Sequence, residues 1–138
     1  MRGGVDGNED TPFVVVIDDN EDDRYLLRHV LRRAVPDATM VEYEAADLAI
    51  EDFADEARFR DRFGTGRVVV MLDINMPRMT GFEFLERVGA ARRDDMKVVI
   101  LSASDSPQDR ECAARFPVVT DTLAKPLSKA RLRELVVG

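Results

Sequence analysis

The segment that decides the fold is Phe13–Arg24, FVVVIDDNEDDR, in which five apolar residues run directly into a cluster of carboxylates. A continuous β-branched run is typical of a strand covered on both faces, as in a parallel sheet. Asn20 predicts the N-cap of a following helix, because its side chain can accept a hydrogen bond from the first turn. Five of the six residues in Asp18–Asp23 are acidic, and like charges this close repel one another. The cluster therefore needs a cation or a helix dipole to offset the repulsion.

The alternation of strand and helix continues along the chain. Four more apolar segments predict strands, at Thr39–Tyr43, Val68–Leu72, Val98–Leu101 and Val118–Ala124. Spacing and capping signals predict five helices: one after Asn20 that ends before Pro36, one over Ala45–Phe53 with an extension and loop to Arg67, one over Phe82–Ala91, one from near Pro107, and one after Ser128. Five strands alternating with five helices indicate an α/β fold with helices on both faces of a parallel sheet.

Composition narrows the class of protein. The 138 residues are 45% hydrophobic and 34% charged, which fits one globular domain over 12–138 behind a flexible tail at 1–11. The net charge of −7 argues against direct nucleic-acid binding, because phosphate contacts need a basic surface.

No signal peptide or long apolar run is seen, so we expect a cytoplasmic protein without membrane insertion. Cys112 and His29 are each the single residue of their type, which excludes an internal disulfide and leaves little material for a zinc site or a Ser-His-Asp triad.

Polar residues whose side chains can bind a metal ion or take part in a reaction follow four of the predicted strands. Asp18 and Asp19 follow the first strand, Asp73 the third, Ser102 the fourth and Lys125 the fifth. In open α/β sheets ligands bind outside the carboxyl ends of the strands, where these residues meet. Three carboxylates there suit Mg²⁺, and a carboxylate beside Mg²⁺ can act as a nucleophile toward phosphorus. The ammonium and the hydroxyl would neutralise the transferred oxygens.

The remaining acidic residues of the opening segment have a simpler interpretation. Asp22 and Asp23 fall in the first turn of the predicted helix, where the dipole favours negative charge. We therefore attribute these two carboxylates to helix stability and leave them out of the predicted site.

Four motifs at the strand ends resemble those of the receiver domain of bacterial two-component response regulators. They are Asp18-Asp19, the segment Asp73–Gly81 (DINMPRMTG), Ser102-Ala103 and Lys125-Pro126. The resemblance runs from about Phe13 to the C-terminus. It implies a flavodoxin-like (βα)5 fold, a doubly wound five-stranded parallel sheet with strand order 2-1-3-4-5. Only about a dozen residues follow Lys125-Pro126, so we expect a stand-alone receiver domain with no output domain.

The resemblance implies a role for each motif residue. Asp73 matches the phosphoacceptor, which takes a phosphoryl group from a histidine kinase. Ser102 matches the switch hydroxyl, and Lys125 matches the cation that pairs with the phosphoryl oxygens, with a cis peptide bond before Pro126. The implied Mg²⁺ ligands are Asp18 largely through water, Asp19 directly, Asp73, and Asn75 through its backbone carbonyl.

The implied function is a phosphoacceptor signalling switch rather than an enzyme, with only self-catalysed phosphoryl transfer and autodephosphorylation. Its partners would be a sensor histidine kinase or phosphotransfer protein, and a downstream protein or phosphorelay. The expected output surface lies near Asp105–Arg110 and Thr120–Lys129. Family members often dimerise through the helix from near Pro107, the last strand and the last helix. Thr122 departs from the family, which commonly has Tyr or Phe there, an aromatic whose burial accompanies activation.

Two other functions fit parts of the pattern. A Mg²⁺-dependent phosphatase of the haloacid dehalogenase type also uses an Asp nucleophile on a parallel sheet. That class usually has a second Asp two positions later as general acid, whereas this chain has Asn75, which cannot transfer a proton. The third function is an unphosphorylated protein-interaction module, against which the intact acidic site argues.

Overall fold

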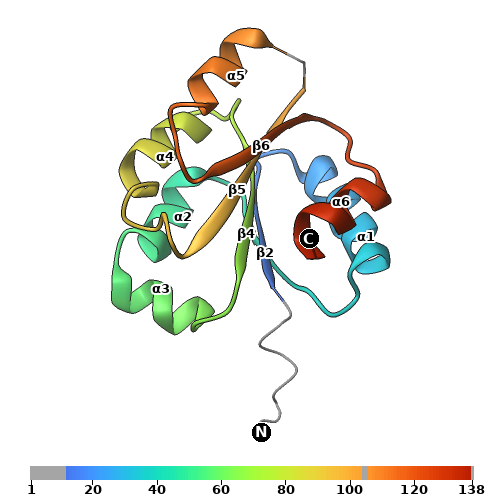
Figure 1. The fold of residues 1–138 in the computed structure, drawn as a ribbon, viewed down its shortest axis with the longest axis horizontal. Coiled ribbons are helices and arrows are strands. Elements are labelled where there is room, and N and C mark those ends of the chain that lie inside the picture. Colours follow the sequence, from blue (N-terminus) through green and yellow to red (C-terminus); the bar gives the residue numbers. More distant parts are fainter. Residues whose placement is uncertain (1–11, 104–105, 138) are drawn as a thin grey trace, which may run out of the picture.

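The computed structural model describes residues 12–103 and 106–137 (Figure 1). The expected flexible tail at 1–11 and Asp105 of the expected output surface lie outside the described residues.

Five parallel strands form one sheet in the described part of the chain. They are β2 (Phe13–Ile17), β3 (Thr39–Tyr43), β4 (Val68–Asp73), β5 (Met96–Ser102) and β6 (Val119–Ala124). The order across the sheet is β3-β2-β4-β5-β6, which confirms the predicted order 2-1-3-4-5. Because all strands run the same way, their carboxyl ends lie on one edge, and the crossing from β2 to β4 makes the switch point there.

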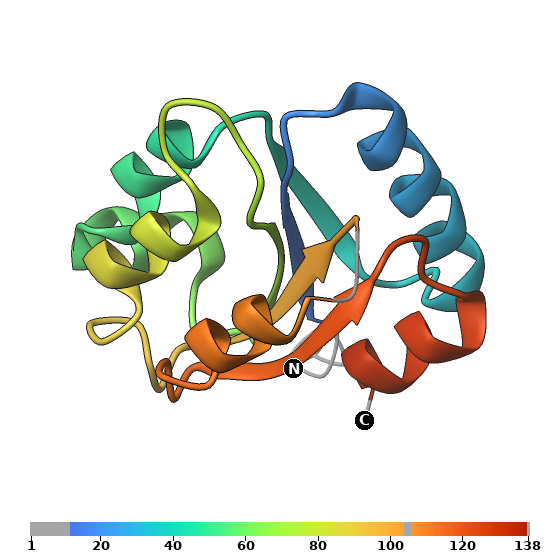
Figure 2. The ribbon, with the colours of Figure 1, turned by 90° about the horizontal axis from the view of Figure 1, so that it is seen from above.

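Six helices of the described residues cover the two faces of the sheet. They are α1 (Glu21–Ala34), α2 (Ala46–Phe53), α3 (Glu56–Phe63), α4 (Gly81–Val88), α5 (Pro107–Ala113) and α6 (Lys129–Val137). Helices α1 and α6 lie together on one face and α2 to α5 on the other (Figures 1 and 2). Within the described residues, no helix combines the length and the apolar composition that a bilayer crossing requires.

The β-branched run in β2 is buried on both faces, as predicted. Val14 and Val16 pack in the cluster that includes Leu27 and Leu31 of α1, whereas Val15 and Ile17 belong to the cluster on the opposite face. Side chains of a strand alternate between faces, so one short run supplies both layers of the core. This burial fixes the end of β2, and with it the position of the acidic pair that follows.

The segment Ala54–Arg67 differs from the expected extension of the preceding helix. Helix α2 ends at Phe53, and a separate helix begins at Glu56 after an N-cap at Asp55, whose side chain accepts a hydrogen bond from the Arg58 amide at 2.9 Å. The break brings Phe59 and Phe63 into the core, where each ring centroid lies 5.4 Å from that of Phe53. The cap and this aromatic packing explain why two helices form between β3 and β4, where one extended helix was predicted.

Replacing the cap residue Asp55 with Ala is expected to lower the free energy of unfolding by about 1 kcal/mol, because the first turn of α3 loses its side-chain acceptor. Asp55→Asn keeps an acceptor of similar size and should retain most of the stability. Urea unfolding of both variants provides the measurement. Equal losses in the two variants would show that the charge of Asp55, and not its cap, matters.

Candidate functional site

Asp73 is the last residue of β4, the central strand, and is 5% exposed. Its Oδ1 accepts a hydrogen bond from the Asn75 amide at 3.1 Å. Helix α4 begins directly above this strand end at Gly81, where a Cβ atom would lie 2.7 Å from the Asp73 carbonyl oxygen and 2.9 Å from the Ile74 Cα. Only glycine allows this approach, which explains the Gly81 that ends the DINMPRMTG motif.

The acidic pair lies at the neighbouring strand end, after β2. Asp18 is 3% exposed, and its Oδ1 accepts from the Asn20 amide at 2.9 Å, whereas Asp19 is exposed. Arg24 of α1 donates to the Asp18 carbonyl oxygen at 2.7 Å, and it also pairs with Glu42 of β3 at 3.3 Å. These contacts hold the β2–α1 turn in place, because they join its backbone to both neighbouring elements.

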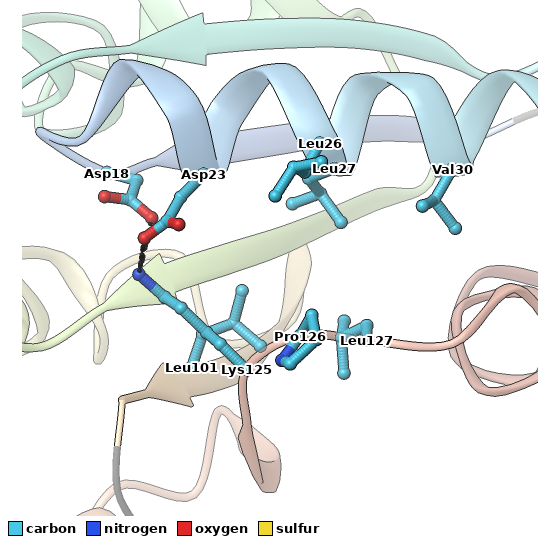
Figure 3. A pocket seen from close by; sticks show the side chains of 9 residues that line it. All are labelled: Asp18, Asp23, Leu26, Leu27, Val30, Leu101, Lys125, Pro126 and Leu127. Atoms are coloured by element: carbon cyan, nitrogen blue, oxygen red, sulfur yellow. Dashed lines mark hydrogen bonds and ion pairs between the residues drawn. The ribbon is translucent and has the colours of Figure 1, made fainter.

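Lys125 follows the end of β6, and its side chain extends toward Asp18 (Figure 3). Its Nζ lies 2.8 Å from Asp18 Oδ2 and 3.6 Å from Asp73 Oδ2. The peptide bond to Pro126 is cis, as the resemblance implied, and the Lys125 amide donates to the Ser102 carbonyl oxygen at 2.9 Å. Burial alone would lower the pKa of Lys125, but hydrogen bonds to carboxylates outweigh burial and raise it, so the ammonium is charged at neutral pH.

Burial raises the pKa of the Asp73 carboxyl to about 6, and the nearby Asp18 carboxylate acts in the same direction. The hydrogen bond from the Asn75 amide and the charge of Lys125 oppose this rise. Asp73 is therefore a charged group held in an unfavourable environment at neutral pH, which a further cation would relieve.

The residues present fit a divalent cation. Asp18, Asp19 and Asp73 each offer one carboxylate oxygen, and these three atoms lie within 4.8 Å of one another. Ligands on opposite sides of a Mg²⁺ ion lie about 4 Å apart, and Mg²⁺ usually keeps several waters, so one of the three carboxylates would bind the ion through a water. All these ligand atoms are oxygens, as a hard cation prefers, and Asn75 lies two residues after Asp73, on the loop that follows β4.

The other two predicted positions lie at the same edge or close to it. Ser102 is 2% exposed at the end of β5, the strand that pairs with both β4 and β6. Thr122 is half-buried on β6, opposite Ile100. The structure thus brings the predicted acidic, hydroxyl and ammonium groups to the carboxyl edge, at the ends of four strands.

A family model for the response regulator receiver domain matches residues 14–137. The chain belongs to the response regulator receiver family. Receiver domains are signalling modules of two-component systems that interact with histidine kinases or phosphotransfer proteins and bind Mg²⁺ at an acidic pocket.

Curated relatives agree with this assignment. The cyclic di-GMP phosphodiesterase response regulator RpfG of Xanthomonas campestris is 32% identical over 123 residues, which cover 87% of this chain and 29% of that protein. This receiver chain therefore spans less than a third of that relative. The two-component response regulator ORR3 of Oryza sativa is 28% identical over an alignment that covers 92% of this chain and 89% of the ORR3 sequence.

Solved receiver structures share the fold. A two-component response regulator from Cytophaga hutchinsonii has a TM-score of 0.76 with 23% identity, covering 91% of this chain and 93% of its own. A response regulator receiver protein from Dyadobacter fermentans has a TM-score of 0.73 with 26% identity, covering 91% and 94% of the two chains. The flavodoxin-like prediction is thus confirmed.

One residue that contacts this receiver site was not predicted. Asp23 of α1, attributed above to the helix dipole alone, has its Oδ2 2.8 Å from the Lys125 Nζ. The sequence carries the acidic residue at this position, but only the orientation of α1 over the sheet edge brings it to the lysine. No local pattern distinguishes Asp23 from its exposed neighbour Asp22.

Proposed function

We propose that this receiver domain is a phosphoacceptor switch in which Asp73 takes a phosphoryl group from the phosphohistidine of a histidine kinase or phosphotransfer protein. The observation that carries the proposal is the placement of one buried carboxylate, Asp73, beside two more carboxylates and 3.6 Å from the Lys125 ammonium. The three carboxylates suit a divalent cation, and the Lys125 ammonium suits an anionic group attached to Asp73.

In this reaction a carboxylate oxygen of Asp73 attacks the phosphorus. A P–O bond forms, the P–N bond to the donor imidazole breaks, and the electron pair of that bond stays on the imidazole nitrogen. Lys125 and the Ser102 hydroxyl would pair with the phosphoryl oxygens. Mg²⁺, when held by Asp18, Asp19, Asp73 and the Asn75 carbonyl, would neutralise the charge on the phosphoryl group. Water attack on the same phosphorus would reverse the modification.

The output would be a change of protein contacts. Phosphorylation adds a charge of roughly −1.5 to −2 at the edge where Lys125 and Ser102 lie, so these two groups re-pair. They precede α6 and α5, which lie beside β6, and the Asp121–Arg131 ion pair joins β6 to α6 there. We propose that this α5–β6–α6 face binds a downstream protein, a phosphorelay partner or a second copy of the chain. Because position 122 holds Thr and not the aromatic residue common in the family, the proposed change in this face does not use the burial of an aromatic side chain there.

Acetyl phosphate, a small phosphoryl donor, tests the proposed chemistry. With Mg²⁺ present, the intact mass should increase by one phosphoryl group, and the adduct should be lost on treatment with hydroxylamine, which cleaves acyl phosphates but not phosphoserine. A chelator should prevent the adduct. A hydroxylamine-stable adduct would place the phosphoryl group on a hydroxyl, and absence of any adduct with both acetyl phosphate and a phosphorylated histidine donor would refute the proposal.

Asp19→Asn is expected to remove most of the stabilisation of the protein by Mg²⁺. A cation that binds only the folded state raises the melting temperature with concentration, and the exposed carboxylate of Asp19 belongs to the proposed ligand set. Thermal unfolding across a Mg²⁺ titration measures the effect. Asp37→Asn removes an exposed carboxylate outside the site and should leave the response unchanged. An unaltered response in Asp19→Asn would exclude Asp19 as a ligand.

A further inference from the structure

The ammonium of Lys125 is shared unequally among three carboxylates. Its Nζ lies 2.8 Å from Asp18 Oδ2, 2.8 Å from Asp23 Oδ2 and 3.6 Å from Asp73 Oδ2. Figure 3 shows the side chains of Asp18, which follows β2, and Asp23 of α1 approaching the lysine tip at one end of the pocket lined by Leu27 and Pro126. Two short contacts therefore hold the ammonium short of Asp73.

We propose that Asp23 is a positioning residue that restrains Lys125 in the unphosphorylated chain and competes with the phosphoryl group for it. The proposal rests on the proposed function of Asp73 as phosphoacceptor. An ammonium has three N–H donors, and two are directed to Asp18 and Asp23. A phosphoryl group on Asp73 thus has one donor available until a carboxylate releases Lys125.

Asp23 differs from Asp18 in what else it does. Asp18 belongs to the predicted cation ligands, so its contact with Lys125 would persist as part of a shared acidic site. Asp23 lies outside that ligand set. Among the described residues, the hydrogen bond of its carboxylate is the one it accepts from Lys125. Restraint of the ammonium is therefore the specific effect of Asp23 on the site.

Of the two short contacts of Lys125, we expect the contact with Asp23 to break first when a phosphoryl group is present. The Asp23 side chain is 36% exposed, compared with 4% for Asp18. Water can replace an exposed partner at little cost, whereas a buried carboxylate left without its cation is strongly destabilised. The first turn of α1 keeps Asp23 in reach of the lysine, because the Asp23 amide donates to the cap residue Asn20 at 2.9 Å.

Removing the charge of Asp23 should strengthen binding of a phosphoryl analogue. In Asp23→Asn, the anion loses a charged competitor for Lys125, and the site loses one negative charge that repels the anion. Beryllofluoride with Mg²⁺ serves as the probe, and its bound form is counted by fluorine NMR in a titration. We expect affinity to rise about three- to fivefold, within the range of a partly exposed ion pair.

Asp22→Asn is the matched control, because it removes the same charge from the same helical turn at an exposed position. Its affinity should stay within about twofold of wild type, since a surface charge acts weakly through water. Asp23→Glu, which keeps the charge on a longer side chain, should bring the affinity back toward the wild-type value. All three variants are compared with wild type under the same Mg²⁺ concentration.

The outcomes separate the inference from the proposed function. An equal rise in Asp22→Asn and Asp23→Asn would show an effect of net charge and overturn the positioning role. Unchanged or weaker binding in Asp23→Asn, with wild type still binding beryllofluoride, would overturn the inference and leave the phosphoacceptor proposal standing. Failure of wild type to bind beryllofluoride or to accept a phosphoryl group would overturn both.

Discussion

Asp73→Asn is expected to abolish the phosphoryl adduct and, at the same time, to raise the melting temperature of the protein without Mg²⁺. The amide of Asn cannot act as the carboxylate nucleophile, so the loss of the adduct is complete. Stability rises because burial disfavours the charged carboxyl of Asp73, as its pKa of about 6 indicates. The cost of this charge is present above about pH 6 and fades below it, since the folded state then binds the proton.

The expected gain at neutral pH is on the order of 1–2 kcal/mol, because each unit of pKa shift corresponds to about 1.4 kcal/mol and the adjacent Lys125 loses part of its pairing. Thermal and urea unfolding in the presence of a chelator measure it. Asp19→Asn is the control, because it removes the same charge from the same edge but from an exposed side chain. A destabilised Asp73→Asn would show that the Asp73–Lys125 pairing outweighs the cost of burial.

Lys125→Met should have the opposite effect on stability. Methionine keeps much of the length of the side chain, but Asp18 and Asp73, with side chains 4% and 7% exposed, then lose the cation that lies between them. We expect a loss of about 2–4 kcal/mol in the free energy of unfolding without Mg²⁺. Phosphorylation should become slower without disappearing, because the nucleophile Asp73 remains and only a neutralising charge is lost.

Urea unfolding with and without Mg²⁺ tests this prediction, with Lys129→Met as the control at an exposed lysine on α6. Mg²⁺ should restore more stability to Lys125→Met than to wild type, because the cation then offsets carboxylate repulsion that no ammonium relieves. Equal stability of Lys125→Met and Lys129→Met would contradict the electrostatic role of Lys125 at the site.

The sheet and its edge could be predicted from the sequence because each strand carries its own signal. The run Phe13–Ile17 is apolar on both faces, and its observed bounds match the prediction. Strand ends in a parallel sheet share one edge, so the positions of Asp18, Asp73 and Lys125 followed from strand assignment alone. The residues that interrupt the apolar pattern therefore indicated the site without any knowledge of the packing.

Details that depend on tertiary contacts could not be predicted in this way. Strand β5 begins at Met96, two residues before the predicted start, because Met96 pairs with Val68 on β4. The break between α2 and α3 depends on where Phe59 and Phe63 find space in the core. The contact of Asp23 with Lys125 joins residues 102 apart in the chain, and it exists only because α1 packs on one face of the sheet with its first turn near the end of β6.

The identity of the modified residue is the most direct test of the account. Wild-type protein phosphorylated by acetyl phosphate and Mg²⁺ would be reduced with borohydride, which converts an aspartyl phosphate to homoserine, and then mapped by peptide mass spectrometry. If Asp73 is the phosphoacceptor, homoserine appears at position 73 and at none of the other aspartate positions. Homoserine at Asp18, Asp19 or Asp23, or an adduct of equal yield in Asp73→Asn, would contradict it.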